Sequence, residues 1–474
     1  MNGLYINILY INMIDKKIKD LINKCIVRIN AEVISININI PYELETPGKG
    51  QGTGFFIDNK GLILTCAHVV DNAKNIYVEI PNISSKQYLC SIVYICPHFD
   101  LALIKTHEIF NKDYLKLANS DKLNSGMNVF AVGFPKNFSR INVNNIKYTE
   151  GIISGQQSGL IQTDTAINPG NSGGPLFYKD KVIGINSKKL VGDNVSNIGY
   201  AIPINNFRNI NINYNLKSKI IYRPSFESIF NNTNENISSI ITNNKNSGGV
   251  YISKMYNHSM LKKIGLNENI IITKIDKYDI DNYGYTNFRW LGEKVHLNNI
   301  LDFYKNYDKI KIEYYENGKK FINTIQLDPY IPSIKQVFPN LEDIYYYIVG
   351  GAIFMDLTMN HIQENMDIFI NLDKADLHKK ILICSFVFPN SYFNILNNIK
   401  SGDIIHKIND KEVSCIIDFK KAIKTPIVIN NNKFFKVETK DYKVCLAETN
   451  ILKKHDEELS KLYRFNITNF ENNK

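Results

Sequence analysis

The sequence predicts a mainly β protein, in which a β-sandwich or a pair of β-barrels is followed by two copies of a smaller domain. Residues 25–210 contain many short runs of β-branched and aromatic residues. A polar stretch rich in asparagine interrupts this pattern at residues 210–248. Beyond it, residues 248–280 and 381–413 share one order of apolar and polar segments.

The first region is predicted to be built from short strands. Its apolar runs are separated by Gly, Asn, Asp and Pro, and they include GTGFFID, LILTCAHVV, LCSIVYI, LALIK and NVFAVGF. Short strands divided by turn-forming residues are typical of an all-β sandwich or barrel. The helical spacing of apolar residues is clearest at residues 14–25, IDKKIKDLINKC, where we expect a helix.

The second region contains an internal repeat. Residues 248–280, GGVYISKMYNHSMLKKIGLNENIIITKIDKYDI, predict a strand, a short helix, a glycine stop and a second strand. Residues 381–413, ILICSFVFPNSYFNILNNIKSGDIIHKINDKEV, follow the same order. A repeat of this size predicts two copies of one small α/β domain.

Composition and charge are those of an ordinary soluble protein. The chain has 474 residues, enough for about three domains, with 44% hydrophobic and 22% charged residues. Its net charge of +10 is not gathered into blocks, so we expect no nucleic-acid partner. No run of apolar residues is long enough to cross a bilayer, so we expect no membrane span.

The cysteines and the N-terminus suggest a cellular compartment. Seven cysteines are widely spaced, with no C-x-x-C pair and no zinc-site spacing. We therefore expect a reducing intracellular location, in the cytoplasm or nucleus, and no metal or other cofactor. The start, MNGLYINILYINMIDKK, has neither a basic lead nor a small-residue cleavage site, so we expect no secretory signal there.

One short motif predicts catalytic chemistry. Residues 167–176, INPGNSGGPL, place Ser172 among three glycines. Glycine loses much conformational freedom on folding, so the motif predicts either a tight turn or backbone N–H groups gathered around the hydroxyl. A serine nucleophile needs a base and a group that orients the base. His68 and Asp100 each lie at the margin of a predicted strand and precede Ser172 in the chain.

Two rival interpretations of this region are weaker. The sequence around Ser172 also fits G-x-S-x-G, the nucleophile elbow of α/β-hydrolases, but that motif requires a helix after the serine. Here PLFYKDKVIGINS follows, which predicts a hairpin. A cysteine nucleophile at Cys66 is disfavoured, because its apolar strand indicates a core residue.

The chain resembles the HtrA/Do-like serine proteases. The resemblance is carried by TCAHVV, DLALIK, AVGFP, GIIS, IQTDTAINPGNSGGPL, VIGINS and IGYAIP. It implies a chymotrypsin-like double β-barrel followed by two PDZ-like domains. The corresponding divisions are a protease domain at residues 1–214 (core about 25–210), a first PDZ-like domain at 215–330 and a second at 331–474 with a C-terminal extension. YYYIVGGAIFMDLT and ILKKHDEELSKLYRF are similar to the plant-type Do-like branch.

The resemblance also assigns roles to residues. His68 would be the general base and then the general acid, Asp100 would orient its ring, and Ser172 would be the acyl-forming nucleophile. The backbone N–H groups of Gly170 and Ser172 would form the oxyanion hole. The first specificity pocket would lie between Ala166 with Ile167 and a facing wall near Asn186 and Ser187. Because no acidic residue occurs at the expected base, we expect cleavage after small or medium aliphatic residues.

The implied function is an ATP-independent serine endopeptidase that degrades unfolded or damaged polypeptides. The alternative is a non-catalytic chaperone or peptide-binding scaffold of the same fold. Expected partners are unfolded substrates, peptide ligands of the PDZ-like domains and, by family analogy, further copies of the chain in trimers. In the first PDZ-like domain the loop SFESIFNN carries Ser228 at the expected glycine position, beside Glu227, so we expect little dependence on a peptide's free C-terminus.

Overall fold

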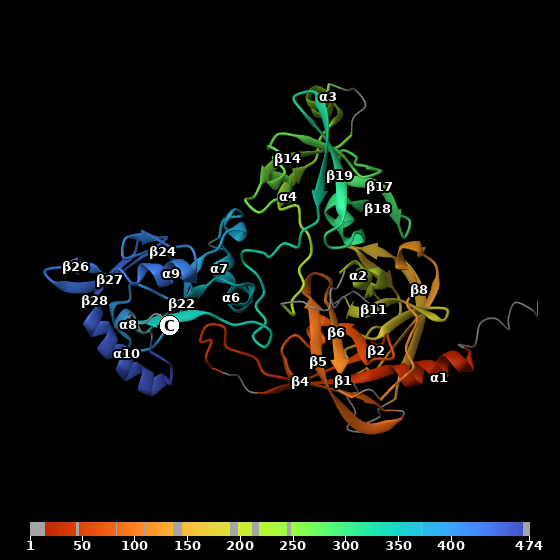
Figure 1. Ribbon diagram of the computed structural model, residues 1–474, viewed down its shortest axis with the longest axis horizontal. Coiled ribbons are helices and arrows are strands. Elements are labelled where there is room, and N and C mark those ends of the chain that lie inside the picture. The colour runs from red at the N-terminus through yellow and green to blue at the C-terminus, as the bar shows by residue number, and fades with distance from the viewer. Residues whose placement is uncertain are drawn as a thin grey trace, which may run out of the picture. The chain divides into compact units, whose positions relative to one another are not determined.

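The computed structural model divides the chain into two compact units (Figure 1). The first comprises Met1–Val33 and Lys49–Tyr330, and the second comprises Ile34–Gly48 and Ile331–Lys474. The predicted three-domain division remains a prediction. The apolar start of the chain lies outside the described residues. The structure describes residues 15–43, 47–81, 83–108, 110–135, 145–189, 198–210, 218–243, 248–370 and 372–467.

Two closed β-barrels form the first part of the first unit, which confirms the predicted fold class (Figure 1). The first barrel has the strand order β1-β2-β3-β6-β5-β4. Its strands are β1 (Ile26–Val33), β2 (Gly48–Phe56), β3 (Leu62–Cys66), β4 (Ala73–Ile80), β5 (Ser84–Cys96) and β6 (Leu101–Thr106). Fully buried Phe55, Phe56 and Tyr94 contribute to its core.

The second barrel has the order β10-β11-β12-β9-β8-β7. Its strands are β7 (Asn128–Gly133), β8 (Lys147–Gln157), β9 (Leu160–Thr163), β10 (Pro175–Tyr178), β11 (Lys181–Lys189) and β12 (Gly199–Pro203). Short 3₁₀ turns η1 (Ala67–Val69), η2 (Pro97–Phe99) and η3 (Ser120–Lys122) connect strands. The predicted N-terminal helix is α1 (Lys16–Cys25), capped by Asp15, and α2 (Ile204–Asn209) follows β12.

The first PDZ-like module is an antiparallel sheet of order β13-β14-β15-β19-β20 with a separate hairpin, β17–β18. Its strands are β13 (Ser228–Asn231), β14 (Val250–Met255), β15 (Ile271–Ile275), β16 (Tyr278–Asp279), β17 (Tyr285–Trp290), β18 (Glu293–His296), β19 (Lys309–Glu316) and β20 (Lys319–Gln326). Its helical segments are α3 (Glu235–Thr242), α4 (Met260–Lys263), α5 (Leu297–Ile300) and η4 (Leu301–Phe303).

This module and the second barrel share one apolar core. Leu123 and Ile153 of the barrel belong to the same cluster of buried side chains as Val250 and Trp290 of the module. The Trp290 indole N–H donates to the Ser120 carbonyl oxygen at 3.0 Å. Because the core is continuous, the barrels and the first PDZ-like module form a single compact unit.

A buried arginine ties the module to the first barrel. The Arg223 guanidinium donates to the carbonyl oxygens of Asn209, Leu301 and Tyr304 at 2.8, 3.0 and 2.7 Å, and to the side-chain oxygen of Asn306. It also lies 5.0 Å from the ring centroid of Phe99, in the turn that leads to Asp100. Burial lowers the pKa of Arg223.

We expect Arg223→Met to destabilise the first unit by about 3 kcal/mol, because it leaves several buried oxygen acceptors without a donor. Chemical denaturation followed by circular dichroism measures this loss. Arg289→Met is the matched control, since Arg289 is exposed and donates to the Gly292 carbonyl oxygen. Equal stability of the two variants would contradict the prediction.

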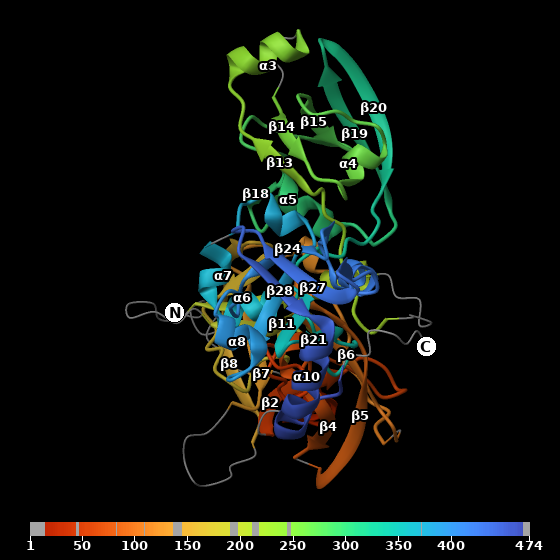
Figure 2. The same cartoon turned by 90° about the vertical axis from the view of Figure 1, so that its left-hand side faces the viewer.

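The second unit contains the second PDZ-like module (Figure 2). The main sheet of this module has the order β21-β22-β23-β24-β27-β26. Its strands are β21 (Tyr346–Val349), β22 (Ala352–Asp356), β23 (Leu382–Val387), β24 (Ile404–Ile408), β25 (Lys411–Glu412), β26 (Ile427–Ile429), β27 (Asn432–Thr439) and β28 (Val444–Glu448). Its helical segments are α6 (Met359–Glu364), α7 (Met366–Ile370), η5 (Asp376–His378), α8 (Tyr392–Leu396), α9 (Ile416–Ala422) and α10 (Thr449–Tyr463).

A segment from between β1 and β2 completes this second unit. Buried Ile38 packs in one cluster with Phe388 and Phe465, and the Tyr42 ring lies 6.2 Å from that of Phe465. The Ser385 hydroxyl donates to the Asn39 carbonyl oxygen at 3.1 Å. The division predicted from the sequence assigns Ile34–Gly48 to the protease domain, whereas the structure includes this segment in the second unit. No helix among the described residues is long and apolar enough to cross a membrane.

Candidate functional site

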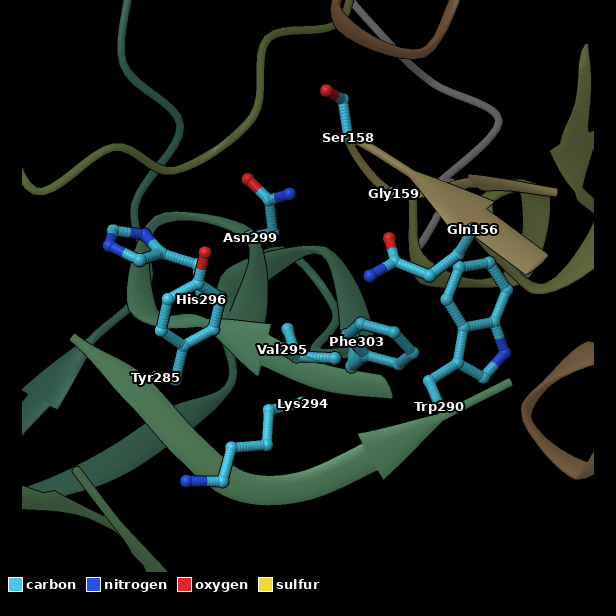
Figure 3. Close-up of a pocket in the computed structure, with 10 residues that line it drawn as sticks. All are labelled: Gln156, Ser158, Gly159, Tyr285, Trp290, Lys294, Val295, His296, Asn299 and Phe303. Carbon is cyan, nitrogen blue, oxygen red and sulfur yellow. The ribbon is translucent and has the colours of Figure 1, made fainter. Parts of the chain in front are cut away.

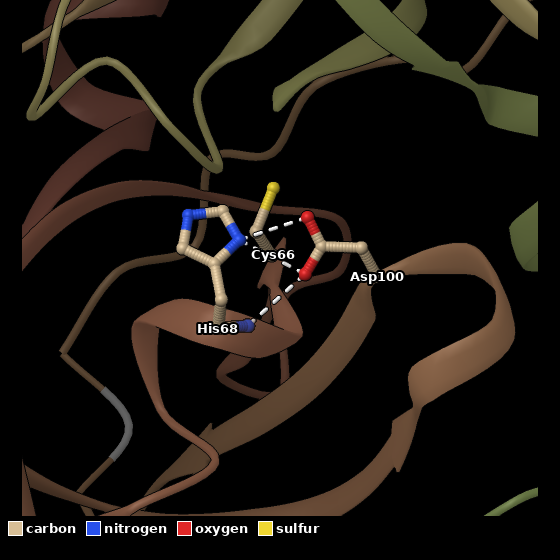
Figure 4. Close-up of side chains that lie close together, drawn as sticks. All are labelled: Cys66, His68 and Asp100. Atoms are coloured by element: carbon tan, nitrogen blue, oxygen red, sulfur yellow. Dashed lines mark hydrogen bonds and ion pairs between the residues drawn. The ribbon is translucent and has the colours of Figure 1, made fainter. Parts of the chain in front are cut away.

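His68 and Asp100 are brought together by two neighbouring strands of the first barrel. His68 lies in η1 directly after β3, Asp100 directly precedes β6, and Cys66 pairs with Leu101 across these strands. The His68 Nδ1 atom is 2.9 and 2.8 Å from the two Asp100 carboxylate oxygens (Figure 4). The His68 backbone N–H donates to Asp100 Oδ1 at 3.1 Å. One carboxylate therefore fixes both the ring and the backbone of His68.

The charge on Asp100 sets the tautomer of His68. Burial alone would raise the pKa of Asp100, but hydrogen bonds and charge from His68, with a bond from Ser187, hold it below its ordinary value. An ionised carboxylate only accepts hydrogen bonds, so Nδ1 carries the proton. The other ring nitrogen, Nε2, is then left as a base.

Ser187 connects Asp100 with Ser172. The Ser187 hydroxyl donates to Asp100 Oδ2 at 2.7 Å, and its carbonyl oxygen accepts from Ser172 Oγ at 3.0 Å. Since a hydroxyl carries one proton, Ser172 has to release this bond before it can donate to His68. The sequence predicted Ser187 only as part of a pocket wall and missed its bond to Asp100.

The glycines around Ser172 are required by close packing. At Gly173 φ is +86°, and an added Cβ would lie 2.1 Å from the Thr53 carbonyl oxygen. At Gly174 it would lie 2.2 Å from the Val132 carbonyl oxygen. A hairpin of β10 and β11 follows Ser172, as expected from the sequence, so the requirement of the nucleophile elbow for a helix is not met.

The backbone around Ser172 is held by Thr53. The Thr53 hydroxyl donates to the Gly170 carbonyl oxygen at 2.7 Å, and its N–H donates to the Ser172 carbonyl oxygen at 2.9 Å. The N–H groups of Gly170 and Ser172 have no acceptor within the described part of the chain. Sequence reasoning missed Thr53, although its place between glycines in GQGTGFF is a signal of close backbone approach.

The four predicted pocket residues do not share one environment. Ala166 is exposed, and its carbonyl oxygen accepts from Thr149 Oγ1 at 3.3 Å. Ile167 and Ser187 are 3% and 5% exposed, whereas Asn186 is completely buried. The Asn186 side-chain amide donates to the Pro175 carbonyl oxygen at 3.3 Å. Asn186 is therefore positioned to support the turn from within the core.

A further cavity of about 210 Å³ (Figure 3) is not lined by His68, Asp100 or Ser172. It is lined by the turn after β8 and by the β17–β18 hairpin with α5 and η4 of the first PDZ-like module. Its aromatic lining residues are Tyr285, Trp290, His296 and Phe303. The cavity shares no residue with the predicted specificity pocket.

Cys66, His68 and Asp100 have ligand atoms within 4.8 Å of one another, but their chemistry does not suit a resident metal (Figure 4). The fully buried Cys66 thiol donates to the Asn186 carbonyl oxygen at 3.3 Å, and burial raises its pKa well above the usual value. A metal requires the thiolate. The absence of a metal cofactor remains a prediction.

Asp71 is a second carboxyl group that interacts with His68. Burial raises its pKa to about 6, while the Asn72 N–H and the charge of His68 act in the opposite direction. Above that pH its negative charge stabilises the imidazolium form of His68.

We expect Asp71→Asn to move the acidic limb of the kcat/KM profile to lower pH by a few tenths of a unit. Glu108→Gln, an exposed charge change, is the control, and an upward shift of the limb would contradict the prediction.

Known proteins similar to this chain are serine proteases. A model of the trypsin-like peptidase domain matches residues 52–185. A probable periplasmic serine endoprotease DegP-like of Marinomonas sp. (strain MWYL1) is 27% identical over 395 residues, covering 80% of this chain and 76% of the relative. The serine protease Do-like HtrA of Bacillus subtilis (strain 168) is 32% identical over 308 residues, covering 59% and 64%. The putative protease Do-like 13 of Arabidopsis thaliana is 26% identical over 423 residues, covering 86% and 84%.

The predicted cytoplasmic or nuclear location is wrong, because the similar proteins include endoproteases named as periplasmic. The physical reason for the error lies in the cysteines. All seven are free and buried, and burial raises the pKa of the thiols of Cys25, Cys90 and Cys96 to about 12. Isolated buried thiols are inert, so a lack of disulfides does not indicate a reducing compartment.

Proposed function

Because the chain belongs to the HtrA/Do-like serine proteases, we propose that it degrades unfolded or damaged polypeptides without ATP or a metal ion. It is a serine endopeptidase, and the proposal concerns its substrates and the residues that act on them. The observation that carries it is the contact of His68 with both Asp100 carboxylate oxygens, beside the Ser172 turn. We also propose an extracytoplasmic location, since relatives are named as periplasmic.

The proposed mechanism uses the geometry of these residues. His68 Nε2 takes the proton of Ser172 as Oγ attacks the substrate carbonyl carbon, and the same nitrogen then protonates the leaving amine. Asp100 holds the ring and stabilises the imidazolium. The N–H groups of Gly170 and Ser172 donate to the oxyanion of the tetrahedral intermediate, and one such donor contributes about 10²–10³ in kcat. Water then hydrolyses the acyl-enzyme by the same base.

Degradation of casein tests this function. We expect the full chain to cut casein without added ATP, to leave a tightly folded protein intact, and to keep its activity in EDTA. The alternative, a non-catalytic chaperone or scaffold, would suppress aggregation of an unfolded protein without producing fragments. Intact casein after prolonged incubation would exclude the proposed function.

The specificity of cleavage is a separate expectation. Cleavage is expected after small or medium aliphatic residues, because exposed Ala166 provides apolar surface before the Gly170 turn and no acidic residue occurs at the base expected from the sequence. Mass spectrometry of casein fragments gives the residue before each cut. A majority of cuts after Lys or Arg would contradict this expectation.

Peptide capture is proposed for the first PDZ-like module. Strand β13 lies at the edge of its sheet, and β-strand addition to such an edge is how PDZ domains bind extended peptides. The positive φ of +47° falls on Glu227, one residue before the expected Ser228. Binding of one extended peptide with a free or an amidated C-terminus tests whether this loop recognises a terminal carboxylate.

Assembly into trimers is a further proposal, which sizing by light scattering tests.

A further inference from the structure

The two PDZ-like modules have matching sheets but different outer edges. The order β13-β14-β15-β19 of the first module corresponds to β22-β23-β24-β27 of the second. In both, a short helix, α4 or α8, joins the second and third of these strands. Strand β22 of the second module is therefore the counterpart of β13, the proposed peptide-binding edge of the first.

In the second module this edge is already covered by the chain itself. Strand β21 pairs antiparallel with β22, from Tyr346 opposite Met355 to Val349 opposite Ala352. A peptide added to the edge would occupy the place of β21. The two strands are joined by Gly350 and Gly351, at the position where the first module has its loop before β13.

The Gly350–Gly351 turn holds a carboxylate. Both residues have positive φ, +60° and +74°, and their N–H groups donate to Asp456 Oδ2 and Oδ1, each at 2.8 Å. Asp456 lies on α10, which packs against β21 (Figure 2). Its side chain is 1% exposed. An added Cβ on Gly351 would lie 2.2 Å from Ser391 Cβ, so this approach needs glycine.

Paired backbone N–H groups in a turn are the donors with which PDZ domains capture a peptide's terminal carboxylate. We propose that the Gly350–Gly351 turn is a carboxylate-binding site whose ligand is the chain's own Asp456, so that the second PDZ-like module takes no peptide C-terminus from outside. Strand β21 occupies the position of the peptide backbone, and Asp456 occupies that of the carboxylate. Peptide capture is thereby restricted to the first module.

The environment of Asp456 agrees with a ligand removed from water. Burial raises the pKa of Asp456 to about 7, and the bonds from Gly350 and Gly351 act in the opposite direction. Each carboxylate oxygen of Asp456 accepts one hydrogen bond from a backbone N–H group. An incoming peptide would have to displace this buried group and strand β21 together.

Hydrogen exchange of the full chain, measured by mass spectrometry, tests the proposal without a change at the site. The probe is an extended peptide with a free C-terminus, added to the Ser172→Ala chain so that it is not cut. We expect the segment from Tyr346 to Ala352 to exchange slowly before the peptide is added and equally slowly at saturation. Fast exchange without peptide, or added protection with it, would overturn the proposal.

Variants at Asp456 provide the second measurement. Asp456→Asn keeps the volume of the side chain and places an amide group before the glycine N–H groups, so exchange of the turn should become about tenfold faster or more. Asp456→Ala should do the same. Glu457→Gln, the exposed neighbour on α10, should leave exchange unchanged. Unaltered exchange in Asp456→Asn would overturn the proposal even if Asp456→Ala does not fold.

Discussion

Replacement of Ser172 by alanine is expected to abolish proteolysis, with kcat falling by about 10⁴–10⁶. The hydroxyl is the only group of the Gly170–Gly174 turn that can form an acyl-enzyme. Its removal costs one bond, to the Ser187 carbonyl oxygen, so the fold should be retained. Casein degradation and labelling by a serine-directed fluorophosphonate measure the two effects, and both should disappear together.

Two comparisons make this expectation specific. Ser239→Ala, at a half-buried helical serine of α3, should keep full activity and labelling. His68→Ala should lose a similar amount of activity, and the double variant should be little worse than either single one, because these residues act as a unit. Residual casein cleavage within tenfold of the parent chain would show that another residue is the nucleophile.

The barrels and the order of the candidate catalytic residues were predictable because both depend on local sequence. Strand runs and turn residues mark the ends of β3 and β6, and these ends carry His68 and Asp100. The internal repeat likewise predicts two similar sheets from segments of about thirty residues. Such patterns indicate which face of a strand is buried, so they can be recognised in the sequence without knowledge of the tertiary structure.

Contacts between distant segments were not predictable in this way. Asp456 and the Gly350 N–H are 106 residues apart, and nothing in the sequence of α10 indicates that one carboxylate turns inward. The packing of Ile38 against Phe388 similarly depends on where the chain between β1 and β2 runs. The resemblance to the family predicts Asn186 in a pocket wall. In the structure the bend of β11 turns its side chain into the core.

The hydrogen bond from Ser187 to Asp100 is also a contact between distant segments, since it joins the second barrel to the first. It bears directly on what a change at Asp100 would do. The Asp100 carboxylate accepts three hydrogen bonds, from the His68 backbone, the His68 ring and the Ser187 hydroxyl. All three partners are donors, and an uncharged amide cannot accept from all of them with the same geometry.

Asp100→Asn is therefore expected to lower kcat by about 10⁴ while the barrels stay folded. When the asparagine NH₂ faces the ring, Nδ1 has to accept, the proton moves to Nε2, and His68 loses the lone pair that removes the Ser172 proton. Because the substrate contacts are unchanged, KM should change little. Peptide hydrolysis measures kcat and KM, and circular dichroism checks the fold.

Asp71→Asn is the matched control, because it makes the same substitution at a carboxyl group that also interacts with His68. This variant should keep kcat near the parent value. Near-normal turnover in Asp100→Asn would show that another group orients His68.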